Sequence, residues 1–159
     1  MIFSCILSGV CLPGWSLNSG NCRCYKFLTK PATWTEANSE CQRIAPTNPR
    51  DRPPVTARHL AAPQSKPEND FLANLTGGKN AWIGGFKFAD GKWGWTDGQQ
   101  WNEEKTFWNK NEPNNFGGRE NSLLLNWGGR GGWNDSPFQN RYPYVCQYLD
   151  LQSGCKRSS

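Results

Sequence analysis

Histidine is almost absent from this chain, and His59 is the only one among 159 residues. Zinc sites in proteins are built mainly from His and Cys ligands, with Cys-x-x-Cys as the common short spacing. The closest cysteine pair here, Cys22-Arg-Cys24, is shorter than that spacing. The sequence therefore argues against zinc and favours a disulfide framework for the seven cysteines, which in turn indicates an oxidising, extracellular compartment.

Long apolar runs and a one-sided charge pattern are also missing. The mean hydropathy is -0.77, and no apolar run is long enough to cross a membrane. The formal net charge is +5, but the basic residues are scattered and form no recognisable nucleic-acid module. We therefore predict no membrane span and no nucleic-acid partner, with weak attraction to anionic glycans or lipid headgroups as the alternative use of the charge.

The first ten residues and the last nine are set apart from one central domain. Residues 1–10 are apolar but short and lack a basic start, so they are interpreted as the remnant or an atypical version of a signal peptide. Removing them would remove Cys5 and leave six cysteines. We assign residues 11–150 to one domain, because no internal repeat is visible, and residues 151–159 to a C-terminal tail.

Two helices are predicted from capping signals and apolar spacing. Thr33 and Glu36 form a capping box before a helix that ends at Ile44, and Ser65 and Glu68 form another before a helix that ends at Leu75. The Pro- and Arg-rich residues 45–58 between them are interpreted as an inserted surface loop, with a cleavage or partner loop as the alternative.

Short strands are predicted around these helices. A hairpin is expected over Cys11–Phe27, turning at Asn18-Ser19-Gly20-Asn21. Further strands are expected at Ala81–Phe86, Trp93–Trp95, Leu123–Leu125, Trp133 and Tyr142–Gln147. Helices and strands together predict an α+β fold, and the tryptophans between Trp82 and Trp108 are interpreted as core rather than as a sugar-stacking platform.

A set of oxygen-bearing side chains is concentrated between Glu112 and Asp135, in EPNNFGGRENSLLLNWGGRGGWND. Its members are three carboxylates and two amides, in the order Glu112, Asn114, Glu120, Asn134 and Asp135. An all-oxygen set of this kind suits a hard cation such as Ca²⁺. Each residue alone is also a common turn former in a Gly-rich loop, and this is the structural alternative.

The combination of Glu-Pro-Asn, a later Glu and Trp-Asn-Asp resembles the calcium and sugar site of C-type lectins. The resemblance extends over Cys11–Tyr148 and includes the Cys-Tyr-Lys-Phe and Tyr-Val-Cys segments. It implies a double-loop α+β fold, with two helices flanking small antiparallel sheets and a long calcium-binding loop. It also implies a cis bond before Pro113 and sugar hydroxyls that complete the calcium shell.

The order Glu112 and then Asn114 resembles the mannose-type motif, which implies binding of mannose, glucose, N-acetylglucosamine or fucose. Phe116 stands where galactose binders of the family place an aromatic ring, and it is included among the candidate sugar contacts. The family's auxiliary calcium site corresponds to residues 87–90, Asn115 and Asn121, where Lys87 and amides replace carboxylates. We therefore expect that second site to be weak or absent.

The resemblance also implies a disulfide pattern. Cys41 and Cys146 match the bridge between the family's first helix and last strand, while the positions of a second family bridge are Ser122 and Phe138 here. Four cysteines remain: Cys11, Cys22, Cys24 and Cys155. We expect Cys11 to pair with Cys22 or Cys24 and the other of the two with Cys155; an intermolecular Cys155 bridge, which would give a homo-oligomer, is the alternative.

Three functions are compared. The first is a secreted, non-enzymatic, calcium-dependent lectin for glycan or microbial-surface recognition in innate immunity, glycosylated at the Asn74-Leu75-Thr76 sequon. The second is an interaction domain of the same fold that binds protein partners without sugar. The third is a glycosidase that uses Glu112 and Glu120, which the metal-ligand interpretation makes unnecessary.

Overall fold

The computed structural model describes residues 11–44 and 58–149. The expected signal segment, most of the 45–58 insertion, the C-terminal tail, Cys5 and Cys155 lie outside the described residues. The elements are β1 (Ser16–Asn18), β2 (Arg23–Ala32), α1 (Trp34–Ile44), β3 (His59–Leu60), α2 (Lys66–Leu75), β4 (Ala81–Lys87), β5 (Trp93–Trp95), η1 (Glu103–Lys105), η2 (Phe116–Gly118), β6 (Ser122–Leu125), β7 (Trp133–Ser136) and β8 (Tyr142–Leu149). Within the described ranges, no helix is long and apolar enough to cross a membrane.

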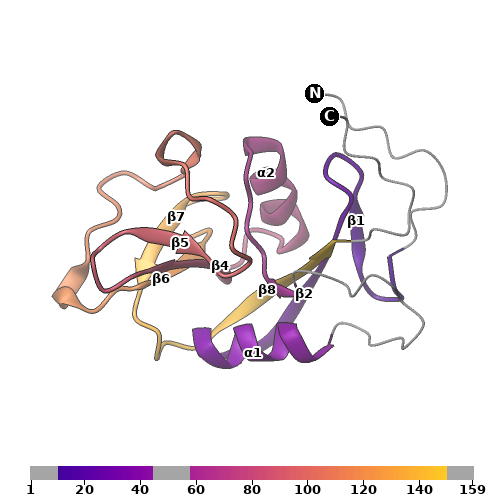
Figure 1. The fold of residues 1–159 in the computed structure, drawn as a ribbon, viewed down its shortest axis with the longest axis horizontal. Coiled ribbons are helices and arrows are strands. Elements are labelled where there is room, and N and C mark those ends of the chain that lie inside the picture. Colours follow the sequence, from indigo (N-terminus) through magenta and orange to yellow (C-terminus); the bar gives the residue numbers. More distant parts are fainter. Residues whose placement is uncertain (1–10, 45–57, 150–159) are drawn as a thin grey trace.

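The strands form one twisted, mostly antiparallel sheet in the order β1-β2-β8-β4-β6-β7, with β3 added to β8 and β5 to β4. The pair β4–β8 is parallel, with Trp82 opposite Tyr144. Figure 1 shows α1 and α2 on opposite sides of the central strands, and the loop-rich strands β4 to β7 at one end. The predicted α+β class is confirmed.

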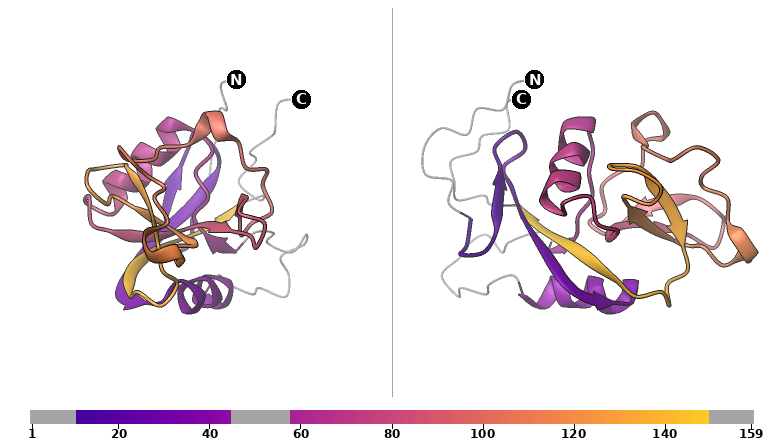
Figure 2. Two further views of the ribbon diagram at one scale, coloured as in Figure 1. Left: turned by 90° about the vertical axis from the view of Figure 1, so that its left-hand side faces the viewer. Right: turned by 180° about the vertical axis from the view of Figure 1, so that it is seen from behind.

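The two ends of the described domain lie side by side at the other end of the sheet, as the right-hand view in Figure 2 shows. Strand β2 pairs along β8 from Arg23 opposite Leu149 to Ala32 opposite Tyr142. The Leu12 N–H also donates to the Tyr148 hydroxyl at 2.9 Å. The site-bearing loops are therefore at the pole of the molecule away from both ends.

The helix caps follow the predicted pattern at α1 and depart from it at α2. At α1 the Glu36 N–H donates to Thr33 Oγ1 at 3.2 Å, and the Thr33 N–H donates to Glu36 Oε2 at 3.0 Å, which completes the capping box. At α2 Ser65 caps the Glu68 N–H at 3.3 Å. The Glu68 carboxylate, however, accepts from the Gln64 N–H at 2.9 Å and from the buried Tyr25 hydroxyl at 2.5 Å. The second capping box is therefore only half formed, because a tertiary partner takes the carboxylate.

Most of the tryptophans belong to the core, as predicted. Trp82 and Trp133 are fully buried, Trp95 is nearly so, and Trp101 and Trp108 pack against that core. The Trp133 ring makes edge contacts with Trp95 and Trp108, at centroid distances of 5.6 and 5.8 Å. Rings of this size give a loop-rich domain its buried apolar area.

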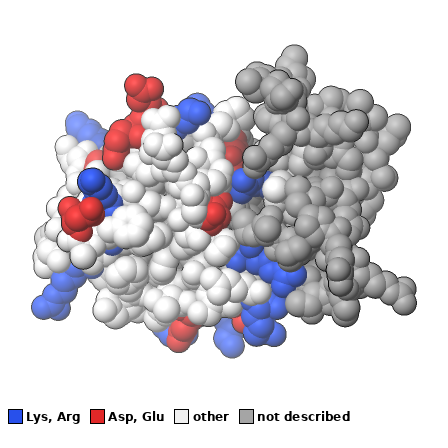
Figure 3. Space-filling model, viewed as in Figure 1, with Lys and Arg blue, Asp and Glu red and all other residues white. Residues whose placement is uncertain are grey.

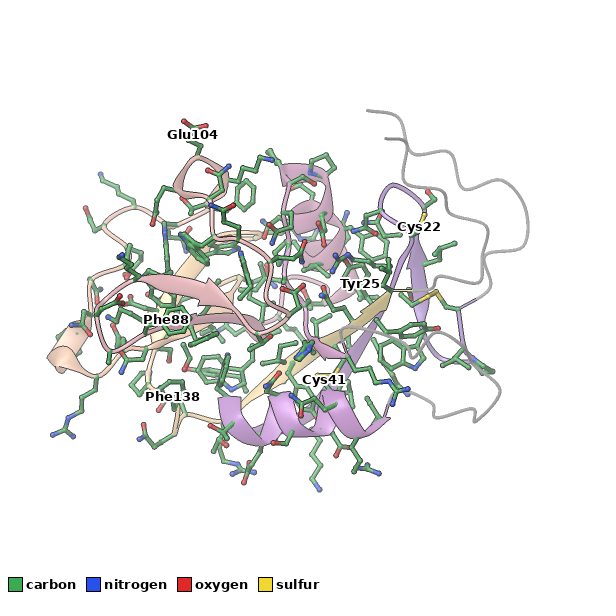
Figure 4. The ribbon with its side chains drawn as sticks, viewed as in Figure 1. Cys22, Tyr25, Cys41, Phe88, Glu104 and Phe138 are labelled. Atoms are coloured by element: carbon green, nitrogen blue, oxygen red, sulfur yellow. A yellow bond between two sulfur atoms is a disulfide. The ribbon has the colours of Figure 1, made fainter. Side chains whose placement is uncertain are left out.

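The disulfides settle one of the open pairings. Cys41 of α1 is bonded to Cys146 of β8, as predicted, and Cys11 is bonded to Cys24. Cys22 is disulfide-bonded too, and the predicted role of Cys155 lies outside the described residues. Figure 4 shows Cys22 near the tip of the β1–β2 hairpin and Cys41 on α1.

The two positions of the missing family disulfide, Ser122 and Phe138, are held by strand pairing and by packing. Phe138 packs edge-on against Trp34, with centroids 5.6 Å apart. Ser122 is fully buried and lies opposite Ser136 in the β6–β7 ladder. The strand before Phe138 is thus held by hydrogen bonds along β6, which offsets part of the loss of a covalent brace.

Candidate functional site

The segment from Phe107 to Glu112 is tied to β7 before the candidate residues begin. The Trp133 N–H donates to the Phe107 carbonyl at 2.8 Å, and the Asn109 N–H donates to the Trp133 carbonyl at 3.0 Å. The Glu112 N–H then donates to the Asn109 carbonyl at 3.0 Å. Gly132 permits this approach, because a Cβ there would meet Asn109 Oδ1 at 1.9 Å. Buried Trp133 therefore fixes where Glu112 stands.

Asp135 is the centre of the candidate site. It lies in β7 opposite Leu123 and is fully buried. Its two carboxylate oxygens accept the N–H groups of Asn114 and Asn115, at 3.0 and 2.8 Å. The acidic side chain of Trp-Asn-Asp thus holds the loop that carries Glu-Pro-Asn, so two distant parts of the predicted ligand set meet.

Glu120 joins the same cluster through backbone groups of the loop. Its Oε2 accepts the Phe116 N–H at 2.7 Å, and its own N–H donates to Asn115 Oδ1 at 3.2 Å. Asn115 adopts a left-handed conformation with φ 48°, which Asn tolerates better than most residues. Its organising role was missed from sequence, although Asn-Asn before Phe-Gly-Gly is a typical signal for such a turn.

Half-buried Glu112 and exposed Asn114 form the rim of the site. The Asn114 side-chain amide donates to Glu112 Oε1 at 2.9 Å, so a hydrogen-bond donor and an acceptor lie side by side. The Glu112–Pro113 peptide bond is cis, as the resemblance implied. The Asn134 amide donates at 2.5 Å to the carbonyl of Asp135, the residue at the centre of the site.

The carboxylates repel one another. Partial burial raises the pKa of Glu112 above its ordinary value, and the hydrogen bond to Asp135 and the negative charge of Asp135 raise it further. Burial likewise raises the pKa of Glu120, assisted by the charge of Asp135, while the Phe116 N–H and the charge of Lys87 act in the opposite direction. A cation among these groups would favour their charged forms.

The donor chemistry fits a calcium ion. Calcium takes six to eight oxygens at about 2.3–2.6 Å, including carboxylates, amide oxygens and backbone carbonyls. Among the described residues, no three His, Cys, Asp or Glu side chains are close enough to make a metal centre by themselves. Calcium here would therefore need amide oxygens, from Asn114 and Asn134, beside the carboxylates.

Two further predicted positions are at the surface. The Phe116 ring is 78% exposed and only its backbone takes part in the cluster. Asn74 is exposed at the end of α2, while the Thr76 hydroxyl of its sequon is buried and donates to the Leu72 carbonyl at 3.0 Å. The asparagine that would carry a glycan is thus accessible in the folded domain.

Comparison with known proteins identifies the family. The family model described as the lectin C-type domain matches residues 30–148. A lectin of Pleurodeles waltl is 35% identical over 144 residues, which cover 87% of this chain and 76% of that protein. The lactose-binding lectin l-2 of Anguilla japonica is 31% identical over 146 residues, which cover 89% of this chain and 80% of that protein. Other curated relatives are longer, and the chain spans 65% of one and 39% of another.

A solved structure agrees with this assignment. The C-type lectin domain of murine dendritic cell inhibitory receptor 2, determined in complex with an N-glycan, superimposes with a TM-score of 0.73 at 28% identity. The match covers 89% of this chain and all of that one. The chain therefore belongs to the C-type lectin family of non-enzymatic carbohydrate-binding proteins.

Proposed function

We propose that this protein binds mannose-type sugars in a calcium-dependent manner, through Glu112, Asn114, Glu120, Asn134 and Asp135. The observation that carries the proposal is the Glu112–Asn114 pair, in which a carboxylate acceptor and an amide donor stand 2.9 Å apart at the rim of a carboxylate cluster. Buried Asp135 holds the backbone of this loop through the Asn114 and Asn115 N–H groups. Membership of a carbohydrate-binding family supports the proposal.

A sugar hydroxyl has one donor and two acceptor lone pairs. At this rim it would accept a hydrogen bond from the Asn114 amide and donate one to the Glu112 carboxylate, which leaves one lone pair for the ion. The five residues named above would hold calcium by their side-chain oxygens, and the ion would supply the attraction for two neighbouring hydroxyls. The donor and acceptor order selects the equatorial 3- and 4-hydroxyls of mannose, glucose, N-acetylglucosamine and, in an equivalent pose, fucose.

A galactose-type preference is the competing specificity. Phe116 projects into solvent beside the rim, and an exposed ring offers a face for an apolar sugar surface. One relative is named for lactose, a galactose-containing sugar. The Glu-Pro-Asn order favours mannose, so we retain that assignment and make galactose an arm of the test.

A protein-interaction domain without sugar binding is the second function. The second disulfide of the family is absent, because Ser122 and Phe138 stand at its two positions. This absence favours an interaction domain, since less covalent restraint acts on the strand that carries Asn134 and Asp135. The β6–β7 ladder and the Phe138–Trp34 contact oppose it. A glycosidase role for Glu112 and Glu120 is not retained, because the family is non-enzymatic.

We also propose an extracellular location. Disulfides persist in oxidising compartments, and both described bridges join distant or hairpin-forming parts of the fold. An intermolecular Cys155 bridge, which would give a homo-oligomer, remains the alternative to pairing within the chain.

The test is retention on mannose-agarose with calcium or with a chelator, and on galactose-agarose in parallel. Glu112→Ala should abolish retention, while Glu104→Ala, which alters an exposed acid on η1 (labelled in Figure 4), should not. At a hundredfold excess over Kd, calcium should stabilise the wild-type protein by about 2.7 kcal/mol. Its thermal midpoint should rise accordingly, and that of Glu112→Ala should rise far less. Chelator-resistant retention, or equal retention of both variants, would refute the proposal.

A further inference from the structure

A groove of about 520 Å³ lies directly beside the candidate site. One wall is the β4–β5 turn, with Lys87, Phe88, Ala89 and Gly91, and the other carries Asn115 and Asn121. Asn115 belongs to both places, because its N–H donates to Asp135 and its side-chain oxygen accepts from the Glu120 N–H. The groove and the candidate site therefore share Asn115 as a common boundary.

The groove contains a positively charged side chain, Lys87, that forms no ion pair with a described acid. Lys87 is half-buried, and none of the ion pairs between described residues involves it. Its ammonium lies 5.7 Å from the centre of the Trp93 ring, a distance at which a cation is attracted to an indole face. Trp93 in turn stacks on Trp101, so the lysine is held in place before any ligand arrives.

The acids nearest the groove are engaged with backbone groups. Glu120 is 9% exposed and accepts the Phe116 N–H, and Asp90 accepts the Lys92 N–H at 3.0 Å within its own turn. The Asn121 side chain makes no hydrogen bond to another described residue, while its carbonyl accepts the Lys87 N–H at 2.9 Å. The groove thus offers a positive charge and an amide to a ligand.

Phe88 gives the groove an apolar side. Its ring is 51% exposed, and Figure 4 shows it at the β4–β5 end of the molecule, away from Cys22 and the chain ends. In Figure 3, acidic and basic side chains both occur on the described part of the surface and are separated by uncharged areas. The groove is therefore distinguished by its aromatic face, its amides and its one ammonium group. An overall positive charge of the surface does not distinguish it.

We propose that this groove is a subsite for a negatively charged substituent, a sulfate or a carboxylate, carried by the glycan whose other part occupies the Glu112–Asn114 rim. Lys87 would pair with the anion, Asn121 would donate a hydrogen bond to it, and Phe88 would pack on the sugar that bears it. The inference rests on the proposed sugar-binding function and deepens it, because it names acidic glycans as the preferred ligands.

The experiment compares a mannose disaccharide with its monosulfated forms by titration calorimetry in calcium. At least one sulfated form should bind the wild-type protein about tenfold more tightly than the parent, as expected for a charge-assisted hydrogen bond. At saturating calcium, Lys87→Gln should remove this preference and leave binding of the parent unchanged. Lys92→Gln, which alters an exposed lysine of the same turn outside the groove, should keep it.

The outcomes separate the two proposals. Equal binding of parent and sulfated sugars by the wild-type protein, or a preference that survives Lys87→Gln, overturns the inference and leaves the proposed function intact. Failure of the wild-type protein to bind either sugar overturns the proposed function and the inference with it. Effective competition by inorganic sulfate at the same concentration also overturns the inference, because the groove would then take a free anion.

Discussion

Protons should compete with calcium for Glu112 and Glu120, and the competition can be measured. In the calcium-free protein, burial and the charge of Asp135 raise the pKa of both groups above the ordinary carboxyl value. A carboxyl whose pKa is raised on folding binds its proton better in the folded state. Its contribution to stability is therefore present at low pH and is lost as pH rises through the raised pKa. Calcium reverses this sign, because it binds the ionised form.

The size of the effect follows from the number of protons displaced. If calcium displaces a proton from both Glu112 and Glu120, a tenfold rise in calcium should lower the pH midpoint of sugar binding by about half a unit. If only one proton is displaced, the same rise should lower the midpoint by about one unit. Sugar binding should accordingly be complete at neutral pH and be lost under mild acid.

The assay is sugar binding against pH at two calcium concentrations, with near-ultraviolet circular dichroism to follow the fold. His59 needs a control, because burial lowers its pKa, and protonating a histidine of this kind as pH falls weakens the fold whether or not calcium is present. His59→Gln should leave the calcium-dependent shift unchanged. A midpoint that stays fixed when calcium is raised would refute the reasoning, since acid would then act on another group.

Three further outcomes are expected. Glu112→Gln combined with Asn114→Asp should move preference from mannose toward galactose in competition assays, because it exchanges donor and acceptor at the rim; unchanged mannose preference would contradict the selectivity argument. Asn74 should carry a glycan in a secreting eukaryotic cell, seen as a mass that falls after glycosidase treatment and that is missing from Asn74→Gln. Replacing Cys41 and Cys146 together by Ala should lower the free energy of unfolding by about 4–5 kcal/mol in denaturant titrations, since the bridge closes a sequence separation of 105 residues; a loss below about 1 kcal/mol would show that packing alone holds α1 to β8.

Local patterns were sufficient to predict much of the fold. The Thr33–Glu36 box and the apolar face of α1 are short-range features, and both are observed. Glu68 shows the limit of such patterns: it has the right spacing for a cap, but Tyr25, which is distant in sequence, takes its carboxylate. Tertiary partners of this kind cannot be inferred from spacing.

The candidate site, too, could be predicted from sequence only in part. Its ligand types were visible in sequence, but the contact between Asp135 and the Asn114 and Asn115 N–H groups depends on how a loop closes over β7. The choice of Cys24 rather than Cys22 as partner of Cys11 depends on the course of the chain before β1. The groove at Lys87 depends on the approach of the β4–β5 turn to Asn121, which no local pattern encodes.

The placement of the two described disulfides determines how the domain would bear a mechanical load. A pull on Leu149 acts on β8, and the ladder separates only Leu149, Tyr148 and Gln147 from the covalent link at Cys146. A pull on Cys11 meets the bond to Cys24, opposite Tyr148 in the same ladder. We therefore expect tension applied at Leu149 to strain the pairing of Gln147–Leu149 before it reaches the Cys146 bond. Strands β6 and β7 would keep their register, so the domain would retain its grip on a ligand under force.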